Sequence, residues 1–370
     1  MRRILPARLA VLCLCLPALA AAQSLGTVKP AGREPTLAIG GLLQVQLDVG
    51  DRGDSRFTND NDRFYLRRAR LNVTGKFLEE FDFRLEMDLA GSLSNSSALR
   101  AQMTDGFITW NRYPAANVRA GQFKTPFGFE QLYGDPRLIT IERSLVNDRL
   151  TASRQIGAQV GGDLLEKRLS YAAGAFNGNA VNNNFNDDDR FFLAGRLAGV
   201  PWQGKLGSQS ATWSVGGNAF SSQDANVPLA DLGLDSTPTT PDRDGIFSGK
   251  RTGSGLDTQL IAGPFELWAE YLRVRFEPDS GIPRRRFDAD GWYGQGSFFV
   301  IPKRLQIVLK YETFDPNDKR DDDNTDAATL GANYYLKGHD LKLMLDYLRT
   351  DAPAPFDSQD KIIARLQVIF

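Results

Sequence analysis

Long stretches in which apolar and polar residues alternate constrain this 370-residue chain more than any other feature. The clearest stretch spans residues 81–89, where an apolar set alternates with a charged set: Phe81, Phe83, Leu85, Met87 and Leu89 against Asp82, Arg84, Glu86 and Asp88. A period of two residues is the signature of a β-strand with two unlike faces. The alternating stretches run to about ten residues or more, which is the length that a tilted membrane strand requires.

The same pattern recurs along the chain and predicts sixteen strands. They lie near residues 37–48, 68–74, 81–89, 100–113, 116–124, 153–164, 167–178, 190–201, 210–222, 254–263, 264–276, 288–301, 302–314, 325–337, 338–350 and 360–370. Two strands leave their register open. In 264–276 the apolar residues change face, which predicts a bulge or a misplaced boundary, and 288–301 is apolar on both faces.

The links between these strands alternate between two classes. Short links fall near 76–80, 113–116, 165–168, 201–209, 263–264, 301–303 and 338; long polar links fall at 49–62, 91–99, 125–152, 178–189, 223–253, 277–287, 315–324 and 351–359. Outer-membrane barrels of bacteria combine short periplasmic turns with longer external loops. The chain is therefore predicted to be an all-β, transmembrane antiparallel barrel of sixteen strands.

Both ends of the chain fit export to the outer membrane of a Gram-negative bacterium. Residues 1–22 have the basic start, apolar stretch and small-residue end of a secretory signal, which leaves 23–370 as a single barrel domain. The last strand alternates Ile362, Ala364, Leu366 and Val368 with polar residues and ends on the aromatic Phe370. Such an ending resembles the signal that outer-membrane assembly machinery reads.

Charge and cysteine content exclude several classes of function. Both cysteines, Cys13 and Cys15, lie in the predicted signal, so the exported chain has no disulfide framework or thiolate metal site. Without the three signal arginines, 41 basic residues face 45 acidic ones, and bulk charge predicts no nucleic-acid partner. The aspartate runs 187–189 and 321–323 lack the glycine and distal glutamate of a calcium loop. No metal or cofactor is expected; cations bridging these loops to lipopolysaccharide are an alternative.

Several arginines share the polar faces of predicted strands. Guanidinium groups that face water inside a barrel can bind oxyanions through paired hydrogen bonds, and this makes a set of them candidates for lining a pore: Arg68, Arg70, Arg84, Arg196 and Arg365. Any barrel lumen is polar, however, and inward carboxylates such as Asp88 and Glu312 oppose the arginines. The sign of the ion selectivity stays open at this stage.

The link at 125–152 is long for a segment without a strand pattern, and such segments are usually functional. It follows the sequence Gly-Gln-Phe-Lys-Thr-Pro-Phe-Gly-Phe at 121–129, in which Pro126 and Gly128 suit a sharp turn away from the wall. Lys124 then stands where the segment begins. The residues allow two arrangements, a segment folded into the lumen or a loop that caps the barrel from outside.

Five stretches together resemble the phosphate-selective porin O and P family over essentially the whole mature chain. They are Phe-Tyr-Leu-Arg-Arg-Ala-Arg-Leu at 64–71, Gly-Gln-Phe-Lys-Thr-Pro-Phe at 121–127, Glu-Arg-Ser at 142–144, Arg-Gln-Ile-Gly at 154–157 and Gly-Ala-Asn-Tyr-Tyr-Leu at 331–336. The resemblance implies a trimeric sixteen-stranded porin whose third external loop folds into the lumen. It also implies an anion site, and the matching positions are Lys124, Arg68, Arg70 and Asp88.

The expected function is passive diffusion of small hydrophilic solutes through the outer membrane, with anions such as phosphate as candidate solutes. A general or cation-preferring porin of the same fold is an alternative. An outer-membrane barrel hydrolase is a further alternative, but the single histidine, His339, has no serine or cysteine partner pattern. We therefore expect a channel and not an enzyme.

Overall fold

The computed structural model describes residues 36–54, 56–57, 62–90, 99–178, 180–186, 188–229, 234, 246–280, 286–353 and 358–370. The predicted signal at 1–22 lies outside the described residues. Within these ranges sixteen strands form, in chain order: β1 Thr36–Gly50, β2 Arg63–Phe77, β3 Phe81–Asp88, β4 Gln102–Tyr113, β5 Ala116–Lys124, β6 Arg154–Leu164, β7 Leu169–Phe176, β8 Phe192–Leu206, β9 Gln209–Pro228, β10 Ile246–Ala262, β11 Phe265–Pro278, β12 Phe287–Ile301, β13 Leu305–Asp315, β14 Thr325–Lys337, β15 Leu341–Asp351 and β16 Ser358–Ile369.

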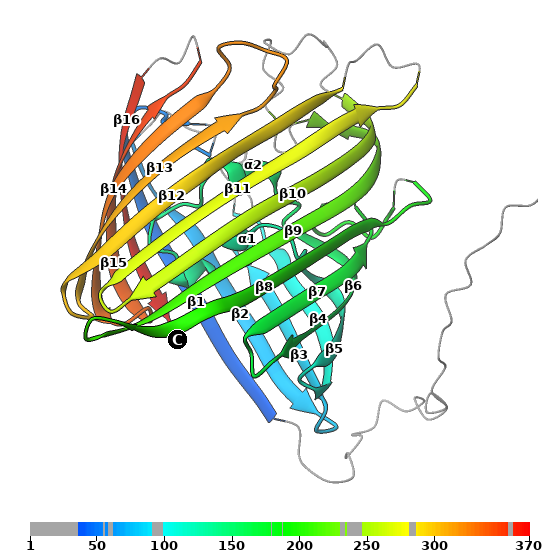
Figure 1. Ribbon diagram of the computed structural model, residues 1–370, viewed down its shortest axis with the longest axis horizontal. Coiled ribbons are helices and arrows are strands. Elements are labelled where there is room, and N and C mark those ends of the chain that lie inside the picture. Colours follow the sequence, from blue (N-terminus) through cyan, green and yellow to red (C-terminus); the bar gives the residue numbers. More distant parts are fainter. Residues whose placement is uncertain are drawn as a thin grey trace, which may run out of the picture.

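Each strand pairs with its neighbours in sequence, and the first pairs with the last, so the sheet closes into a barrel (Figure 1). All the pairs are antiparallel, and β1 meets β16 in a continuous register from Leu42 opposite Ile369 to Gly50 opposite Lys361. Closure leaves no unpaired edge. The predicted fold class, an all-β antiparallel barrel of sixteen strands, is confirmed.

The two faces of the barrel wall differ in polarity, as the alternation predicts. In β15, Leu343, Leu345 and Tyr347 are exposed, whereas the residues that alternate with them, which include Lys342 and Asp346, are buried. An exposed apolar band on a closed barrel is the surface that lipid covers. We refer below to the exposed side of the wall as the apolar face and to the buried side as the polar face.

The structure resolves both strands whose register the sequence left open. β11 pairs with β10 and with β12 without any register shift, so the predicted bulge or displaced boundary in this strand is wrong. Its apolar residues change face because Leu272, Val274 and Phe276 are buried in an apolar cluster on the polar side of the wall. In β12, Tyr293 and Gln295 are buried and Trp292 is exposed, which fixes the register of that strand too.

Strands β9 and β10 are longer than the alternation predicts. The expected long link at 223–253 narrows to 229–245, because β9 continues to Pro228 and β10 starts at Ile246. The added residues do not alternate between apolar and polar. The two extensions are linked by Arg251, whose guanidinium donates to both carboxylate oxygens of Asp224 at 2.6 and 2.9 Å. Strand pairing here continues where apolar alternation has ended, so a hydropathy pattern does not detect it.

The third long link carries three short helices between β5 and β6: α1 Phe129–Leu132, the 3-10 helix η1 Asp135–Arg137 and α2 Leu145–Leu150. We call residues 125–153 the β5–β6 segment. Figure 1 shows α1 and α2 behind the strands β9–β11, and α2 contacts β11, β12 and β13. Among the described residues, no helix has the length and apolar character needed to cross a membrane.

Candidate functional site: the β5–β6 segment and the adjoining cavity

Local sequence explains how the β5–β6 segment turns away from the wall. Gly128 precedes α1 with φ at +85°, and a Cβ at this position would lie 2.6 Å from the Thr151 side chain and 2.9 Å from that of Asn147. Glycine reaches this backbone region without a steric penalty. The hydroxyl of Ser144 caps α2 by accepting from the Asn147 amide at 3.3 Å. The turn and the cap fold the segment back on itself.

Carboxylates on the polar face hold the segment by its backbone amides. Glu270 on β11 accepts from the amides of Phe129 and Glu130 at 2.5 and 3.2 Å. Asp346 on β15 accepts from Ile141 at 2.7 Å. Glu312 on β13 accepts from Leu145 at 2.6 Å. Side chains from three wall strands therefore fix the backbone of the segment.

Donors on the same face hold the carbonyl groups of the segment. Lys342 donates to the Leu138 carbonyl at 2.8 Å, and Arg365 donates to the Ile141 carbonyl at 2.6 Å. Further bonds run from wall donors to segment carbonyls: Asn333 to Ile139, Gln367 to Pro136 and Lys310 to Glu142. Acids and bases on this side of the wall therefore both serve to anchor the segment.

Asp135 joins three arginines where η1 approaches β2. Its carboxylate lies 2.5 Å from Arg70, 2.5 Å from Arg143 and 3.3 Å from Arg68. Burial opposes ionisation of Asp135, but the positive charges, that of Arg143 foremost, hold its pKa well below the usual range of an aspartate. The aspartate is therefore a fixed negative charge between the segment and β2.

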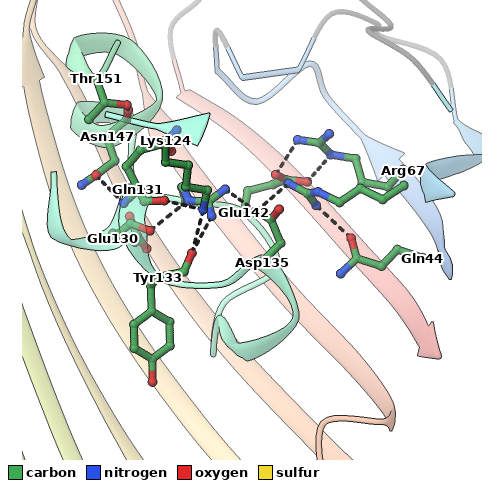
Figure 2. A network of polar contacts seen from close by, with 12 residues as sticks. Gln44, Arg67, Lys124, Glu130, Gln131, Tyr133, Asp135, Glu142, Asn147 and Thr151 are labelled. Atoms are coloured by element: carbon green, nitrogen blue, oxygen red, sulfur yellow. Dashed lines mark hydrogen bonds and ion pairs between the residues drawn. The ribbon is translucent and has the colours of Figure 1, made fainter. Parts of the chain in front are cut away.

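Glu142 forms a second ionic contact beside the first (Figure 2). Arg67 donates to both carboxylate oxygens of Glu142 at 2.9 Å, and Arg365 donates to it at 2.6 Å. Burial raises the pKa of Glu142, but Arg67 and Arg365 outweigh it and leave the pKa below the usual range. The contact depends on a bulge in β2. Gln44 on β1 pairs with Arg68 and the next residue, Val45, pairs with Leu66, so Arg67 has no partner residue on β1. Two consecutive arginines can then reach the segment.

Lys124, at the end of β5, binds the segment by its carbonyl groups instead. Its ammonium donates to the carbonyl oxygens of Gln131 at 2.6 Å and Tyr133 at 3.1 Å, as Figure 2 shows. Among the described residues it forms no ion pair. An ammonium has three N–H donors, and two carbonyl partners leave one of them for a further acceptor.

A cavity of about 460 Å³ lies between the β5–β6 segment and strands β4–β8. Its lining includes Lys124 at the end of β5 and Pro126 and Leu132 from the segment. The wall strands contribute charged and apolar side chains: Asp105, Phe107, Arg119, Phe123, Asp163 and Arg196. The segment is anchored on the β11–β16 and β2 side, and the cavity lies on the other side. This cavity therefore lies toward one side of the barrel wall.

Three basic side chains line the cavity, and two of them, Arg119 and Lys124, have no acidic partner among the described residues. Arg119 donates to the Thr109 hydroxyl at 3.1 Å and stacks on the Phe107 ring, 4.3 Å from its centroid, and among the described residues it forms no ion pair. Arg196 is bound to both carboxylate oxygens of Asp257 at 2.6 and 2.8 Å. Arg119 and Lys124 are thus the cations left for a solute.

The candidate pore residues separate into two groups. Lys124 and Arg196 line the cavity, whereas Arg68, Arg70 and Arg365 are not among its lining residues and contact the β5–β6 segment. The last two candidates lie between the groups: Arg84 approaches Glu86 and lies 3.4 Å from Asp105, and Asp88 lies 2.9 Å from Arg70.

Sequence reasoning missed Arg67, Arg119 and the partnership of Asp135 and Glu142 with wall arginines. Arg119 had a detectable signal, because it alternates with Val118 and Ala120 in a predicted strand. Arg67 had none, because strict alternation assigns it to the apolar face and only the bulge reverses this. No group of three or more histidine, cysteine, aspartate or glutamate side chains placed to hold a metal ion occurs within the described ranges.

The chain matches the family model described as phosphate-selective porin O and P over residues 41–370. It is 22% identical to Porin O of Pseudomonas aeruginosa over 93% of this chain and 90% of that protein. An uncharacterised protein of Aquifex aeolicus is also 22% identical, over 92% of this chain and 89% of that protein.

Solved structures with the same fold include the trimer form of the outer membrane protein OmpT of Vibrio cholerae, with a TM-score of 0.61, 12% identity and coverage of 91% of this chain and 100% of that one. The anion-selective porin from Comamonas acidovorans has a TM-score of 0.60, 13% identity and the same coverage.

Proposed function

The chain belongs to the phosphate-selective porin O and P family of outer-membrane porins, and from this premise we propose that it conducts small hydrophilic solutes by passive diffusion, with a preference for anions. The observation that carries the preference is the cavity between the β5–β6 segment and strands β4–β8, where Arg119 and Lys124 have no acidic partner within the described part of the chain. Phosphate, which the family's description names, is one candidate anion.

The β5–β6 segment is the proposed constriction, folded into the lumen. Its backbone bonds to Glu270, Glu312 and Asp346 support this placement, because these residues lie on the buried polar face of three different strands. A segment held there narrows the passage to the space left beside β4–β8. Solute size would be limited by that space, and ion selectivity by the charges around it.

The inward carboxylates form bonds with other groups of the protein, and this supports an anion preference. Counted alone, carboxylates such as Glu270 and Glu312 would favour cations. Glu312, however, lies 2.9 Å from Arg56 and 3.6 Å from Lys310, and Glu270 accepts hydrogen bonds from the segment. Asp105 on the cavity wall lies 2.7 Å from Arg154 and 3.4 Å from Arg84. With Asp105 compensated, Asp163 is the remaining acid on the cavity lining, and Arg119 and Lys124 outnumber it two to one.

Residue roles follow from the same division. We assign anion contact to Lys124 and Arg119, with Arg196 as a basic neighbour that Asp257 already engages. Arg68, Arg70 and Arg365 are assigned to anchoring the segment, with Asp88 beside Arg70 and Arg84 beside Asp105 as supporting charges. Direct phosphate binding by the β2 arginines, which the family resemblance implies, would require their release from Asp135.

Further proposals rest on the family and on the sequence. Residues 1–22 direct export, 23–370 form a single barrel domain, and the barrel assembles as a homotrimer in contact with lipopolysaccharide. The Vibrio cholerae relative described as a trimer form supports the assembly state. No cofactor or catalysis is part of the proposal, and a barrel hydrolase has no observation in its favour.

Replacing Lys124 tests the anion preference. We expect the wild-type channel to show an anion-selective reversal potential in a potassium chloride gradient across a planar bilayer. Lys124→Glu exchanges a positive for a negative charge at the narrowest part, where charges act at short range. The reversal potential should move toward that of potassium, and any block of chloride current by phosphate should disappear.

Lys124→Gln is the matched control, because it removes the charge and keeps a donor for the carbonyl groups of Gln131 and Tyr133. It should give an intermediate reversal potential. A cation-selective wild-type channel would contradict the anion proposal, and equal selectivity of wild type and Lys124→Glu would show that Lys124 does not face the permeating ion.

A further inference from the structure

Two cations on the lining of the cavity beside β4–β8 have no acidic partner among the described residues. Lys124 has one N–H beyond its two carbonyl partners, and Arg119 has its terminal nitrogens beyond the bond from its Nε to Thr109. Arg196 donates from both terminal nitrogens to Asp257, which compensates its positive charge. Arg119 and Lys124 carry two positive charges and Asp163 on the same lining carries one negative charge, so one net positive charge is left, which matches a monoanion.

Apolar side chains share the cavity with these two cations. Phe107 and Leu132 are partly exposed and lie on its lining, one from the wall and one from the segment, and Phe123 and Pro126 complete this side. The Phe107 ring lies under the Arg119 guanidinium. A solute that contacts Arg119 therefore meets an apolar surface beside it.

The two cations and the apolar side chains beside them suit an organic carboxylate better than inorganic phosphate. Inorganic phosphate is strongly hydrated and has several acceptor oxygens, so leaving water is costly unless most of them regain donors. A carboxylate needs fewer donors, and an apolar body attached to it gains from contact with Phe107 and Leu132. The cavity is thus better matched to the second kind of anion.

We propose, building on the porin function above, that the cavity is a binding site for organic monoanions with an apolar body. Arg119 and Lys124 bind the anionic group, and Phe107 with Leu132 contacts the body. The site ranks such solutes above inorganic phosphate and above small carboxylates of equal charge.

Block of chloride current through the wild-type channel by benzoate, acetate and inorganic phosphate tests this proposal. Benzoate and acetate carry the same charge and differ in the apolar body. We expect half-block by benzoate at a concentration about tenfold below that for acetate, which corresponds to roughly 50–60 Å² of ligand surface removed from water. Phosphate should block more weakly than benzoate at the same pH and ionic strength.

Two variants separate the parts of the site. Leu132→Asn should raise the half-blocking concentration of benzoate toward that of acetate. Arg119→Gln should raise the half-blocking concentrations of both anions and change the ratio between them less than Leu132→Asn does. Glu166→Gln, in the exposed turn between β6 and β7, is the control and should match the wild type with every anion.

The outcomes distinguish this inference from the porin function. An anion-selective channel that benzoate blocks no better than acetate overturns the organic-anion site and leaves the anion preference in place. Stronger block by phosphate than by benzoate overturns it as well. A cation-selective reversal potential in potassium chloride alone would instead contradict the function on which the inference rests.

Discussion

At the scale of single residues, Asp135 shows how charge in this barrel is organised. Its side chain is 3% exposed and meets arginines from β2 and from the β5–β6 segment itself. Arginine and carboxylate pairs of this kind are geometrically specific. Removing one partner from a buried pair leaves the other charge uncompensated, which is costly.

Asp135→Asn is therefore expected to loosen the segment. Arg68 would keep only its bond to Gln44, at 2.8 Å, and the loss should amount to about 3 kcal/mol for a buried pair. Single-channel recordings should show increased open-channel noise, and proteolysis should cleave the segment faster. Glu166→Gln serves as the control; equal noise in Asp135→Asn and wild type would show that the three arginines do not depend on Asp135.

At the scale of elements, the β5–β6 segment and the wall have separable roles. β5 and β6 pair from Asn117 opposite Gly161 to Lys124 opposite Arg154, so the strands meet up to the point where the segment begins. The pairing of β5 with β6 therefore does not involve the β5–β6 segment. The segment in turn depends on wall side chains of β11, β13 and β15.

Replacing residues 129–150 by a short glycine and serine linker should raise the single-channel conductance several-fold and reduce size exclusion, because pore width limits conduction. Shortening the link between β13 and β14 at 319–323 is the matched control and should change the conductance little. An unchanged conductance after the first deletion would contradict the proposed constriction.

Alternation in sequence predicted the strands and the order of links, because a two-faced wall imposes its period on every membrane strand. It did not detect the polar extensions of β9 and β10, which carry no apolar band. Nor could it locate the partners of Glu142, since Arg67 and Arg365 lie 75 and 223 residues away. For this reason Arg68 and Arg70 were predicted to line the pore, whereas in the structure both form ion pairs with Asp135.

At the scale of the whole molecule, the barrel depends on closure between its first and last strands. The Gly41 amide donates to the Phe370 carbonyl at 2.8 Å, and the Phe370 amide donates back at 3.2 Å. A Cβ on Gly41 would lie 2.4 Å from the Phe370 ring and 3.0 Å from the Arg70 carbonyl oxygen. The seam is therefore closely packed around the terminal aromatic residue.

Gly41→Val should disturb this seam, because an added side chain in a close contact costs about 1–3 kcal/mol or more. We expect a lower yield of folded barrel and a lower temperature for the gel shift that accompanies unfolding in detergent. Gly294→Ala in β12 is the control, because its added Cβ meets its nearest neighbour, the Trp292 ring, at 3.7 Å. Wild-type behaviour of Gly41→Val would show that the Phe370 ring can move aside.

The off-centre position of the cavity has a consequence for how such a channel can change. Apart from Lys124 at the end of β5, the side chains that anchor the β5–β6 segment lie mainly on β2, β11 and β13–β16. Polar side chains that a solute would meet, such as Asn117, Gln159 and Ser170, lie on β5–β7. Substitutions at the second set leave the anchoring bonds untouched. Solute preference can therefore diverge among relatives, or be redesigned in a library confined to one wall, while the architecture that supports it is inherited unaltered.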